Sequence, residues 1–214
     1  MKIYLLTNPN FVGDNNQLIG IQLAIQANLK DEQCEFQRIK EADFNVDLLV
    51  NGDFVFVSGS HGLLLAEAIK RHDPNHQILW SGHQYFSEFS SIQHLPDIVA
   101  LPETALSESQ KTELMGKTTL IITSGVAHCV NDNTVEEDHA NFKGQLPPHF
   151  QFPKQVGIIL AGDAPEPNGQ MKYFTEDDAR KQASDIATYL VTHGYDQVDA
   201  AIMITNGPRT GVSG

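Results

Sequence analysis

The sequence predicts an α/β protein with mostly parallel sheets, and three observations support this fold class. Short apolar runs recur along the chain with helical patterns or short crossovers between them, which is typical of strands that pair in parallel. Glycine and serine follow several of these runs, as expected where a strand turns into a helix. A strand–helix–strand pattern over residues 156–205 predicts a βαβ unit with a right-handed crossover.

The first part of the chain contains six apolar runs that we interpret as strands. Ile3–Leu6 is followed by a loop through Gly13 and Asp14, and then by a helical pattern that places Leu18, Ile21, Ile25 and Leu29 on one face. Strand, glycine-bearing loop and helix form the usual first step of a Rossmann-like domain. The later predicted strands are Cys34–Ile39, Phe54–Val57, Ile78–Trp80, Ile98–Leu101 and Leu120–Thr123.

The helix of the βαβ unit is the best-marked element in the sequence. Thr175 and Asp178 form a capping-box pattern at its start, and Gly194 follows its apolar face as a stop signal. The flanking strands are predicted at Val156–Ala161 and Ala200–Thr205. Because parallel strands end at the same edge of a sheet, the loops that follow these two strands should emerge together.

Those two loops carry the candidate ligand contacts of the second half. Glycine allows close approach of the backbone to a ligand, and an arginine fork suits phosphate. The alternative, an ordinary surface turn with its arginine in water, remains open, since neither loop matches a GxGxxG or Walker pattern. The candidate residues are Gly162, Asp163, Thr205, Asn206, Arg209 and Thr210.

The character of the sequence changes between residues 131 and 155. This segment is polar, contains three prolines and lacks clear periodicity, so we interpret it as a linker with a short helix near Glu136–Asn141. The predicted organisation is a Rossmann-like domain at 1–130, a linker at 131–155, and the beginning of a second Rossmann-like domain at 156–214. With only two predicted strands, this second part is short for a nucleotide-binding sheet, and we expect the chain to be a fragment of a longer protein.

Composition narrows the class of partner. The formal net charge of −13 argues against a nucleic acid or an anionic membrane surface as the main partner. No apolar run is long enough to span a bilayer, so no stable membrane insertion is expected. Cys34 and Cys129 lack CxxC or metal-ligand spacing, which favours reduced thiols in a cytoplasmic protein. No motif predicts a metal site, and the oligomeric state is left open.

Several polar residues each follow a predicted strand and should gather at one edge of the sheet. Asp14 could act as a general base toward a hydroxyl, or it could cap the next helix. His61 opens a helix, where it could face an anionic ligand or simply hydrogen-bond a neighbouring strand end. The full set is Asp14, Ser58, Ser60, His61, His83, Glu103, Ser124 and His128.

Seven segments of the chain follow one another in a recognisable order: Val12–Gln17, Val57–Gly62, Asp97–Glu103, Leu120–His128, Gly157–Asp163, Phe174–Arg180 and Ile202–Gly211. Their order resembles that of the plant mitochondrial-fission (ELM1-like) family, whose bacterial members are labelled predicted nucleoside-diphosphate-sugar epimerases. The resemblance spans essentially all 214 residues but only about the first two-thirds of a full family member.

The resemblance implies a GT-B-like architecture, in which two Rossmann-like domains face each other across a cleft. By position, Asp14 becomes the candidate base on the acceptor side, and His61 is the second candidate catalytic residue of this half. The loop residues of the second half become contacts to a nucleoside-diphosphate sugar, which is a substrate, so no cofactor is implied. Where the family more often has two basic residues, this chain has Gly207-Pro208-Arg209, which removes one charge from the phosphate site.

Two functions follow as hypotheses. The first is a glycosyltransferase-type protein that binds a nucleoside-diphosphate sugar. The second is a non-catalytic nucleotide-binding or interaction protein of the same fold. The epimerase label fits poorly, because the sequence has no GxGxxG loop and no YxxxK pair. A hydrolase is a weaker alternative, since no GxSxG nucleophile motif is present.

Overall fold

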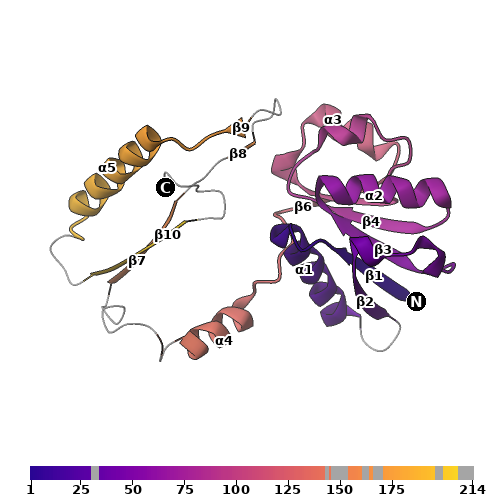
Figure 1. Cartoon of the computed structure of the whole chain (residues 1–214), viewed down its shortest axis with the longest axis horizontal. Helices are drawn as coiled ribbons and strands as arrows, with labels where there is room; N and C mark the ends of the chain where they lie inside the picture. Colours follow the sequence, from indigo (N-terminus) through magenta and orange to yellow (C-terminus); the bar gives the residue numbers. More distant parts are fainter. Residues whose placement is uncertain are drawn as a thin grey trace. The chain divides into compact units, whose positions relative to one another are not determined.

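A computed structural model describes residues 1–29, 34–142, 145, 154–160, 164–165, 171–195 and 200–206. The chain divides into two compact units, Met1–Asp132 and Asn133–Gly214, which we call unit 1 and unit 2 (Figure 1). Each unit is described by itself.

Unit 1 is built on a six-stranded sheet in which every neighbouring pair is parallel. The strand order is β2-β1-β3-β4-β5-β6. All six predicted strands are present, with ends that differ from the predicted ones by at most one residue. The strands are β1 (Lys2–Thr7), β2 (Glu35–Lys40), β3 (Phe54–Ser58), β4 (Gln77–Ser81), β5 (Ile98–Pro102) and β6 (Thr119–Thr123). A parallel α/β sheet flanked by helices confirms the predicted α/β class and is consistent with a Rossmann-like domain, whereas the GT-B-like arrangement stays a prediction.

In the described part of unit 1, three α-helices and four 3-10 turns connect these strands (Figure 1). Helix α3 begins with a capping box between Ser107 and Gln110, which the sequence analysis did not single out. The helices are α1 (Val12–Asn28), α2 (Gly59–His72) and α3 (Glu108–Met115). The 3-10 turns are η1 (Glu41–Asp43), η2 (Val46–Leu48), η3 (Ser87–Ser90) and η4 (Glu103–Ala105).

Side-chain alternation along the strands divides the core into two layers. Tyr4 and Leu6 of β1 belong to the larger cluster, which includes Leu63 of α2 and Leu114 of α3. Ile3 and Leu5 point to the other face and pack with Leu18 of α1 in a smaller cluster. Helices α1 and α2 therefore cover opposite faces of the sheet, as right-handed crossovers in opposite directions require.

Two buried polar contacts fix α2 against the strands. Trp80 is fully buried, and its indole N–H donates to the carbonyl of Gly59 at 2.8 Å. Lys70 is 6 % exposed and lies 2.6 Å from the Asp97 carboxylate. The other oxygen of Asp97 accepts the backbone N–H of Ile78 at 2.7 Å, so one carboxylate connects α2 to β4 and β5.

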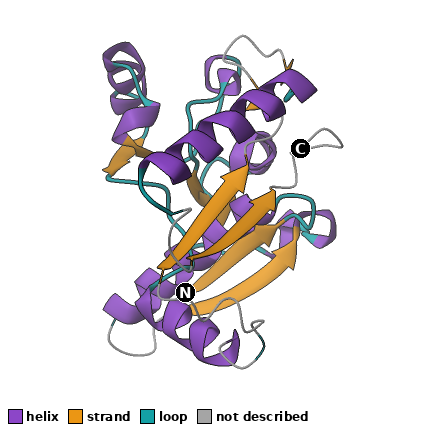
Figure 2. Cartoon of the chain, turned by 90° about the vertical axis from the view of Figure 1, so that its left-hand side faces the viewer, coloured by secondary structure: helices purple, strands orange, loops and turns teal. Residues whose placement is uncertain are grey.

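Unit 2 contains the predicted βαβ pattern (Figures 1 and 2). Strands β7 (Lys154–Leu160) and β10 (Ala200–Asn206) are parallel, and helix α5 (Glu176–Thr192) lies between them in the chain. The predicted capping box is confirmed: the Thr175 hydroxyl accepts the N–H of Asp178 at 3.2 Å, and the Asp178 carboxylate accepts the N–H of Thr175 at 3.0 Å.

Two elements of unit 2 differ from the sequence interpretation. Helix α4 (Asp132–Phe142) is longer than the helix predicted at 136–141, and occupies much of the predicted linker. All of its residues except Thr134 are exposed, so no apolar stripe marked its length in the sequence. The loop after β7 contains a short antiparallel pair, β8 (Ala164–Pro165) and β9 (Met171–Lys172). Two-residue strands give no periodic signal.

The Asp97 carboxylate should contribute strongly to the stability of unit 1. Asp97→Ala leaves the buried Lys70 ammonium without its counter-charge and removes the acceptor for Ile78, so we expect a loss of about 2–4 kcal/mol. Urea unfolding followed by the fluorescence of Trp80, the single tryptophan, reports on this unit. The control is Asp47→Ala, where a 74 % exposed carboxylate faces His72 at 3.6 Å and the expected loss is under about 0.5 kcal/mol. Equal losses would contradict this assignment.

Candidate functional site

The strand order of unit 1 creates one point where the chain reverses its direction across the sheet. From β1 the chain moves to β2 on one side, and it then crosses back to β3 on the other side. In open α/β sheets, the crevice at the carboxyl ends of such a strand pair is the usual ligand site. Here the segments that follow β1, β2 and β3 bring three titratable side chains together, which we call the Asp14–His61–Glu41 cluster.

Asp14 lies in the first turn of helix α1, not in a loop as predicted, because the helix begins at Val12. The N-cap residue is Phe11, whose side chain makes no capping bond. The Asp14 carboxylate instead accepts from the Ser58 hydroxyl at 3.4 Å and from the Gln17 amide at 3.3 Å. Both contacts are long, and the side chain is 14 % exposed. The Asp14 carboxylate therefore connects the start of α1 to the end of β3, and part of it stays exposed to solvent.

His61 lies in the first turn of helix α2, where the predicted loop has already become helical. Its Nδ1 is 3.8 Å from Asp14 Oδ2, and its Nε2 is 3.1 Å from Glu41 Oε1. The Phe11 ring stacks on the imidazole with a centroid distance of 4.2 Å and an interplanar angle of 14°. The imidazole thus lies between two carboxylates, with no well-directed hydrogen bond to either, and is covered on one face by an aromatic ring.

Glu41 is the member of the cluster that the sequence analysis missed. It begins the 3-10 turn directly after β2, and its Oε2 accepts the Asn8 amide at 2.8 Å. Its Oε1 is buried and makes no well-directed hydrogen bond, although His61 Nε2 is close in distance. Its position in the sequence could have identified it, because Glu41 follows a predicted strand, as Asp14 and His61 do.

The close approach of these groups depends on Gly59 at the β3–α2 junction. Its φ of +75° is a conformation that side chains disfavour. A Cβ at this position would lie 2.3 Å from Asp14 Oδ2 and 2.9 Å from the His61 ring. Only glycine lets the strand turn into the helix while both side chains keep their places.

The charge balance of the cluster limits what it can bind. Two carboxylates surround one imidazole, so the cluster is negative whichever protonation state His61 adopts. A neutral imidazole can donate one proton, whereas an imidazolium can donate to both carboxylates at once. This arrangement can take up or release a proton, but it disfavours an anion directly beside His61. The anionic-ligand hypothesis for His61 is therefore not supported by its surroundings.

Of the other predicted polar residues, only Ser58 contacts the cluster through a described hydrogen bond. His83 packs edge-on against Phe86, and Glu103 begins η4. The backbone of His128 lies against Gly20 of α1. A Cβ on Gly20 would be 2.3 Å from the carbonyl oxygen of His128. These residues follow strands farther along the sheet from the point of reversal.

The candidate residues of the second half are described only in part. Thr205 is an exposed residue near the end of β10, and Asn206 is its last residue. Gly162, Asp163, Arg209 and Thr210 lie outside the described residues. Their role as ligand contacts stays a prediction.

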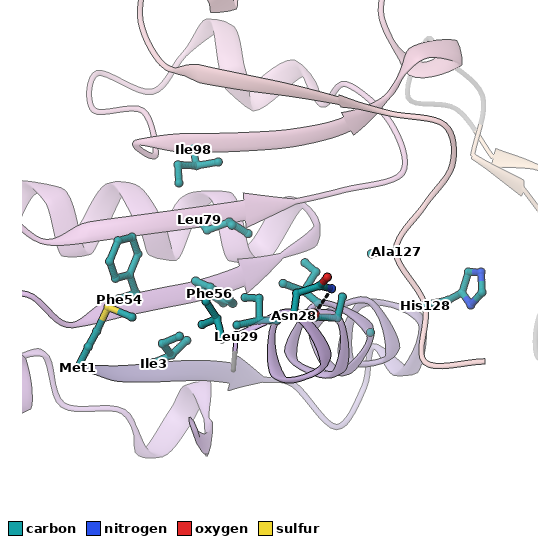
Figure 3. Close-up of a pocket in the computed structure, with 14 residues that line it drawn as sticks. Met1, Ile3, Asn28, Leu29, Phe54, Phe56, Leu79, Ile98, Ala127 and His128 are labelled. Atoms are coloured by element: carbon teal, nitrogen blue, oxygen red, sulfur yellow. Dashed lines mark hydrogen bonds between the residues drawn. The ribbon is translucent and has the colours of Figure 1, made fainter. Parts of the chain in front are cut away.

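A cavity of unit 1 lies away from the cluster, on the face of the sheet beside α1 (Figure 3). It measures about 700 Å³ and is lined mainly by apolar side chains, among them Ile21, Phe56 and Leu79. Asp14, Glu41 and His61 do not line it. Figure 3 shows the His128 side chain directed away from the strands. The cavity lining includes few polar side chains, Asn28 and His128, whereas the cluster consists of three titratable side chains.

Comparison with known protein families, with curated proteins and with solved structures finds no match. In the described part of the chain, no three His, Cys, Asp or Glu side chains are arranged to hold a metal ion. No helix among the described residues is both long and apolar enough to cross a membrane.

Gly59→Ala tests whether the cluster depends on this junction. We expect a loss of stability of more than about 2 kcal/mol and displacement of the His61 imidazole resonances in NMR spectra, because the new methyl group displaces Asp14. Gly52→Ala is the matched control: its φ is +93°, but nothing lies within 4 Å of the added Cβ. It should cost only the backbone strain of about 1–2 kcal/mol and leave His61 unchanged. If both variants lose the same stability and keep the His61 signals, crowding at Gly59 is not the constraint.

Proposed function

We propose that this chain is a GT-B-like, glycosyltransferase-type protein that uses the Asp14–His61–Glu41 cluster to activate an acceptor hydroxyl. The observation that carries the proposal is the position of His61, which follows β3. Its imidazole lies between the carboxylate of Asp14, which follows β1, and that of Glu41, which follows β2. The donor in this proposal is a nucleoside-diphosphate sugar, as the family resemblance implies.

The chemistry asked of the cluster is a single proton transfer. The acceptor oxygen forms a bond to the anomeric carbon of the sugar, while the bond from that carbon to the diphosphate oxygen breaks. The diphosphate leaves with the electron pair, and the acceptor proton passes to the Asp14–His61 pair. A carboxylate with long hydrogen bonds, such as Asp14 at 3.3 and 3.4 Å, keeps lone-pair capacity for this proton.

Within this mechanism, His61 and Glu41 position Asp14 and hold charge. Glu41 is itself held by Asn8, which keeps a carboxylate 3.1 Å from Nε2 of His61, on the side away from Asp14. The negative charge of the cluster suits a neutral hydroxyl and keeps the diphosphate at a distance. The proposal therefore assigns the diphosphate to the loops of unit 2, with Arg209 as its main cationic contact.

A second candidate function is a non-catalytic binding protein of the same fold. The observation that favours it is how little of the cluster is exposed: the Asp14, Glu41 and His61 side chains are 14 %, 16 % and 21 % exposed. A cluster closed in this way could serve to hold β1, β2 and β3 together without chemistry. Turnover measurements on variants separate the two functions.

Asp14→Asn is the decisive substitution. It preserves size but removes the proton acceptor, so kcat should fall at least about a hundredfold while the affinity for the nucleoside-diphosphate sugar stays within about twofold. Asp47→Asn changes an exposed carboxylate of the same unit and should leave both quantities unchanged. The measurement is release of nucleoside diphosphate from a panel of donors in the presence of hydroxyl acceptors.

The result that contradicts catalysis is sugar-nucleotide binding by the unaltered protein without turnover across the panel. In that case the non-catalytic function is the better description. Turnover that survives Asp14→Asn would instead show that the chemistry lies elsewhere in the chain.

A substitution of Arg209 tests the proposed binding of the diphosphate by the loops of unit 2. Loss of a charge-assisted bidentate contact in Arg209→Ala should weaken binding of the nucleoside-diphosphate sugar about tenfold or more. Arg180→Ala is the control, because that guanidinium is 74 % exposed and pairs with Glu176 on the surface of α5. Affinities that agree within about twofold in a calorimetric titration would rule out the proposed role of Arg209.

A further inference from the structure

The two edge strands of the unit 1 sheet differ in a way that bears on self-association. An unprotected sheet edge offers a row of unpaired backbone groups, and proteins commonly block it with charged side chains. The β2 edge carries Glu35, Arg38 and Lys40. The β6 edge, Thr119–Thr123, has the sequence Thr-Leu-Ile-Ile-Thr, without any charge or proline. Only the β2 edge has the usual protection.

Strand β6 is also exposed on both faces of the sheet. Ile121 and Ile122 point to opposite faces and are 43 % and 42 % exposed. Their partners in β5 are better covered: Leu101, which is paired with Ile122, is completely buried, and Ala100, which is paired with Ile121, is partly buried. Among the described residues, β6 pairs with β5 on one side, and no strand pairs with its other side.

The sequence that contains β6 carries no charged side chain. Residues 118–131 contain no Asp, Glu, Lys or Arg, although the whole chain has a net charge of −13. Two copies that meet at this edge would bring no like charges directly opposite each other. At other surfaces, the net charge would oppose association.

The sequence of β6 is complementary to itself when two copies run antiparallel. With the two-fold axis at Ile121, each Thr119 faces the partner's Thr123, each Leu120 faces the partner's Ile122, and the two Ile121 side chains face each other. Thr–Thr pairs and pairs of branched apolar residues are favourable cross-strand neighbours. A two-fold arrangement also closes the edge, because each copy uses the same strand once.

We propose that β6 is a homodimerisation edge, at which two copies of this chain pair antiparallel about Ile121 to form one continuous sheet. A strand of five residues is only about 17 Å long, so the contact is small and the dimer weak, with a dissociation constant in the roughly micromolar range. Added salt should strengthen the dimer, because screening reduces the repulsion between two chains of the same net charge.

Sedimentation velocity over a roughly hundredfold range of protein concentration tests the proposal. The unaltered chain should show a monomer–dimer equilibrium that shifts toward dimer as salt is added. Ile121→Lys places two like charges opposite each other and should raise the dissociation constant at least tenfold. Leu23→Lys makes the same change at a 40 % exposed position of α1 and should leave the equilibrium unchanged.

Crosslinking gives a second test that does not depend on destabilising the strand. In a background with Cys34→Ser and Cys129→Ser, mild oxidation should convert Ile121→Cys into a disulfide-linked dimer, because opposite residues on antiparallel strands have Cβ atoms about 4.5–5.5 Å apart. Leu23→Cys should stay monomeric. The proposal is wrong if the unaltered chain is monomeric throughout, if Ile121→Lys dimerises as well as the unaltered chain, or if both cysteine variants crosslink equally.

Discussion

The handedness of the crossover between parallel strands is the constraint from which the candidate site follows. The chain leaves β1 through α1 toward β2 and leaves β3 through α2 toward β4, in opposite directions across the sheet. Because both crossovers are right-handed, α1 and α2 cover opposite faces, and the carboxyl ends of β1 and β3 are left between them. Asp14 and His61 each belong to the first helical turn after one of these strands. Topology thus brings them to the same edge of the sheet, and Gly59 at the β3–α2 junction leaves the space in which they meet.

Bringing two carboxylates and an imidazole together in a largely covered position has an energetic cost, and the surrounding residues reduce it. Asp14 receives the Ser58 hydroxyl and the Gln17 amide, while Glu41 receives the Asn8 amide. Each carboxylate also faces one nitrogen of His61. One oxygen of Glu41 lacks a well-directed hydrogen bond. A buried acceptor left in this state costs free energy, and such groups are concentrated at sites that bind or react.

The sequence predicted the elements well where a periodic or capping signal exists. The six strands of unit 1, the parallel βαβ pattern of unit 2 and the Thr175–Asp178 capping box are all confirmed. The helix start at Val12 was less predictable, because Phe11 is not a capping residue type and no side chain marks the first turn. Asp14 was therefore placed in a loop, although its position after β1 was correct.

The partners within the site were harder to predict than the elements. Nothing in the local sequence around Glu41 indicates that its carboxylate meets His61, because that contact depends on how far the turn after β2 folds back across β1. The Gly59 requirement is likewise visible only when the distance from its missing Cβ to Asp14 is known. Sequence patterns reveal which edge of the sheet a residue occupies, whereas contacts across that edge depend on packing.

The central claim is that the substrate-facing surface of unit 1 is the Asp14–His61–Glu41 cluster. NMR observation of the histidine imidazole resonances during titration with a nucleoside-diphosphate sugar and a hydroxyl acceptor tests this claim most directly. Our account predicts that the His61 signals move on addition of the acceptor, together with those of the Phe11 ring that stacks on it. The exposed His72, which pairs with Asp47, should not move. Saturable binding that shifts other histidines and leaves His61 and Phe11 unchanged would contradict the account.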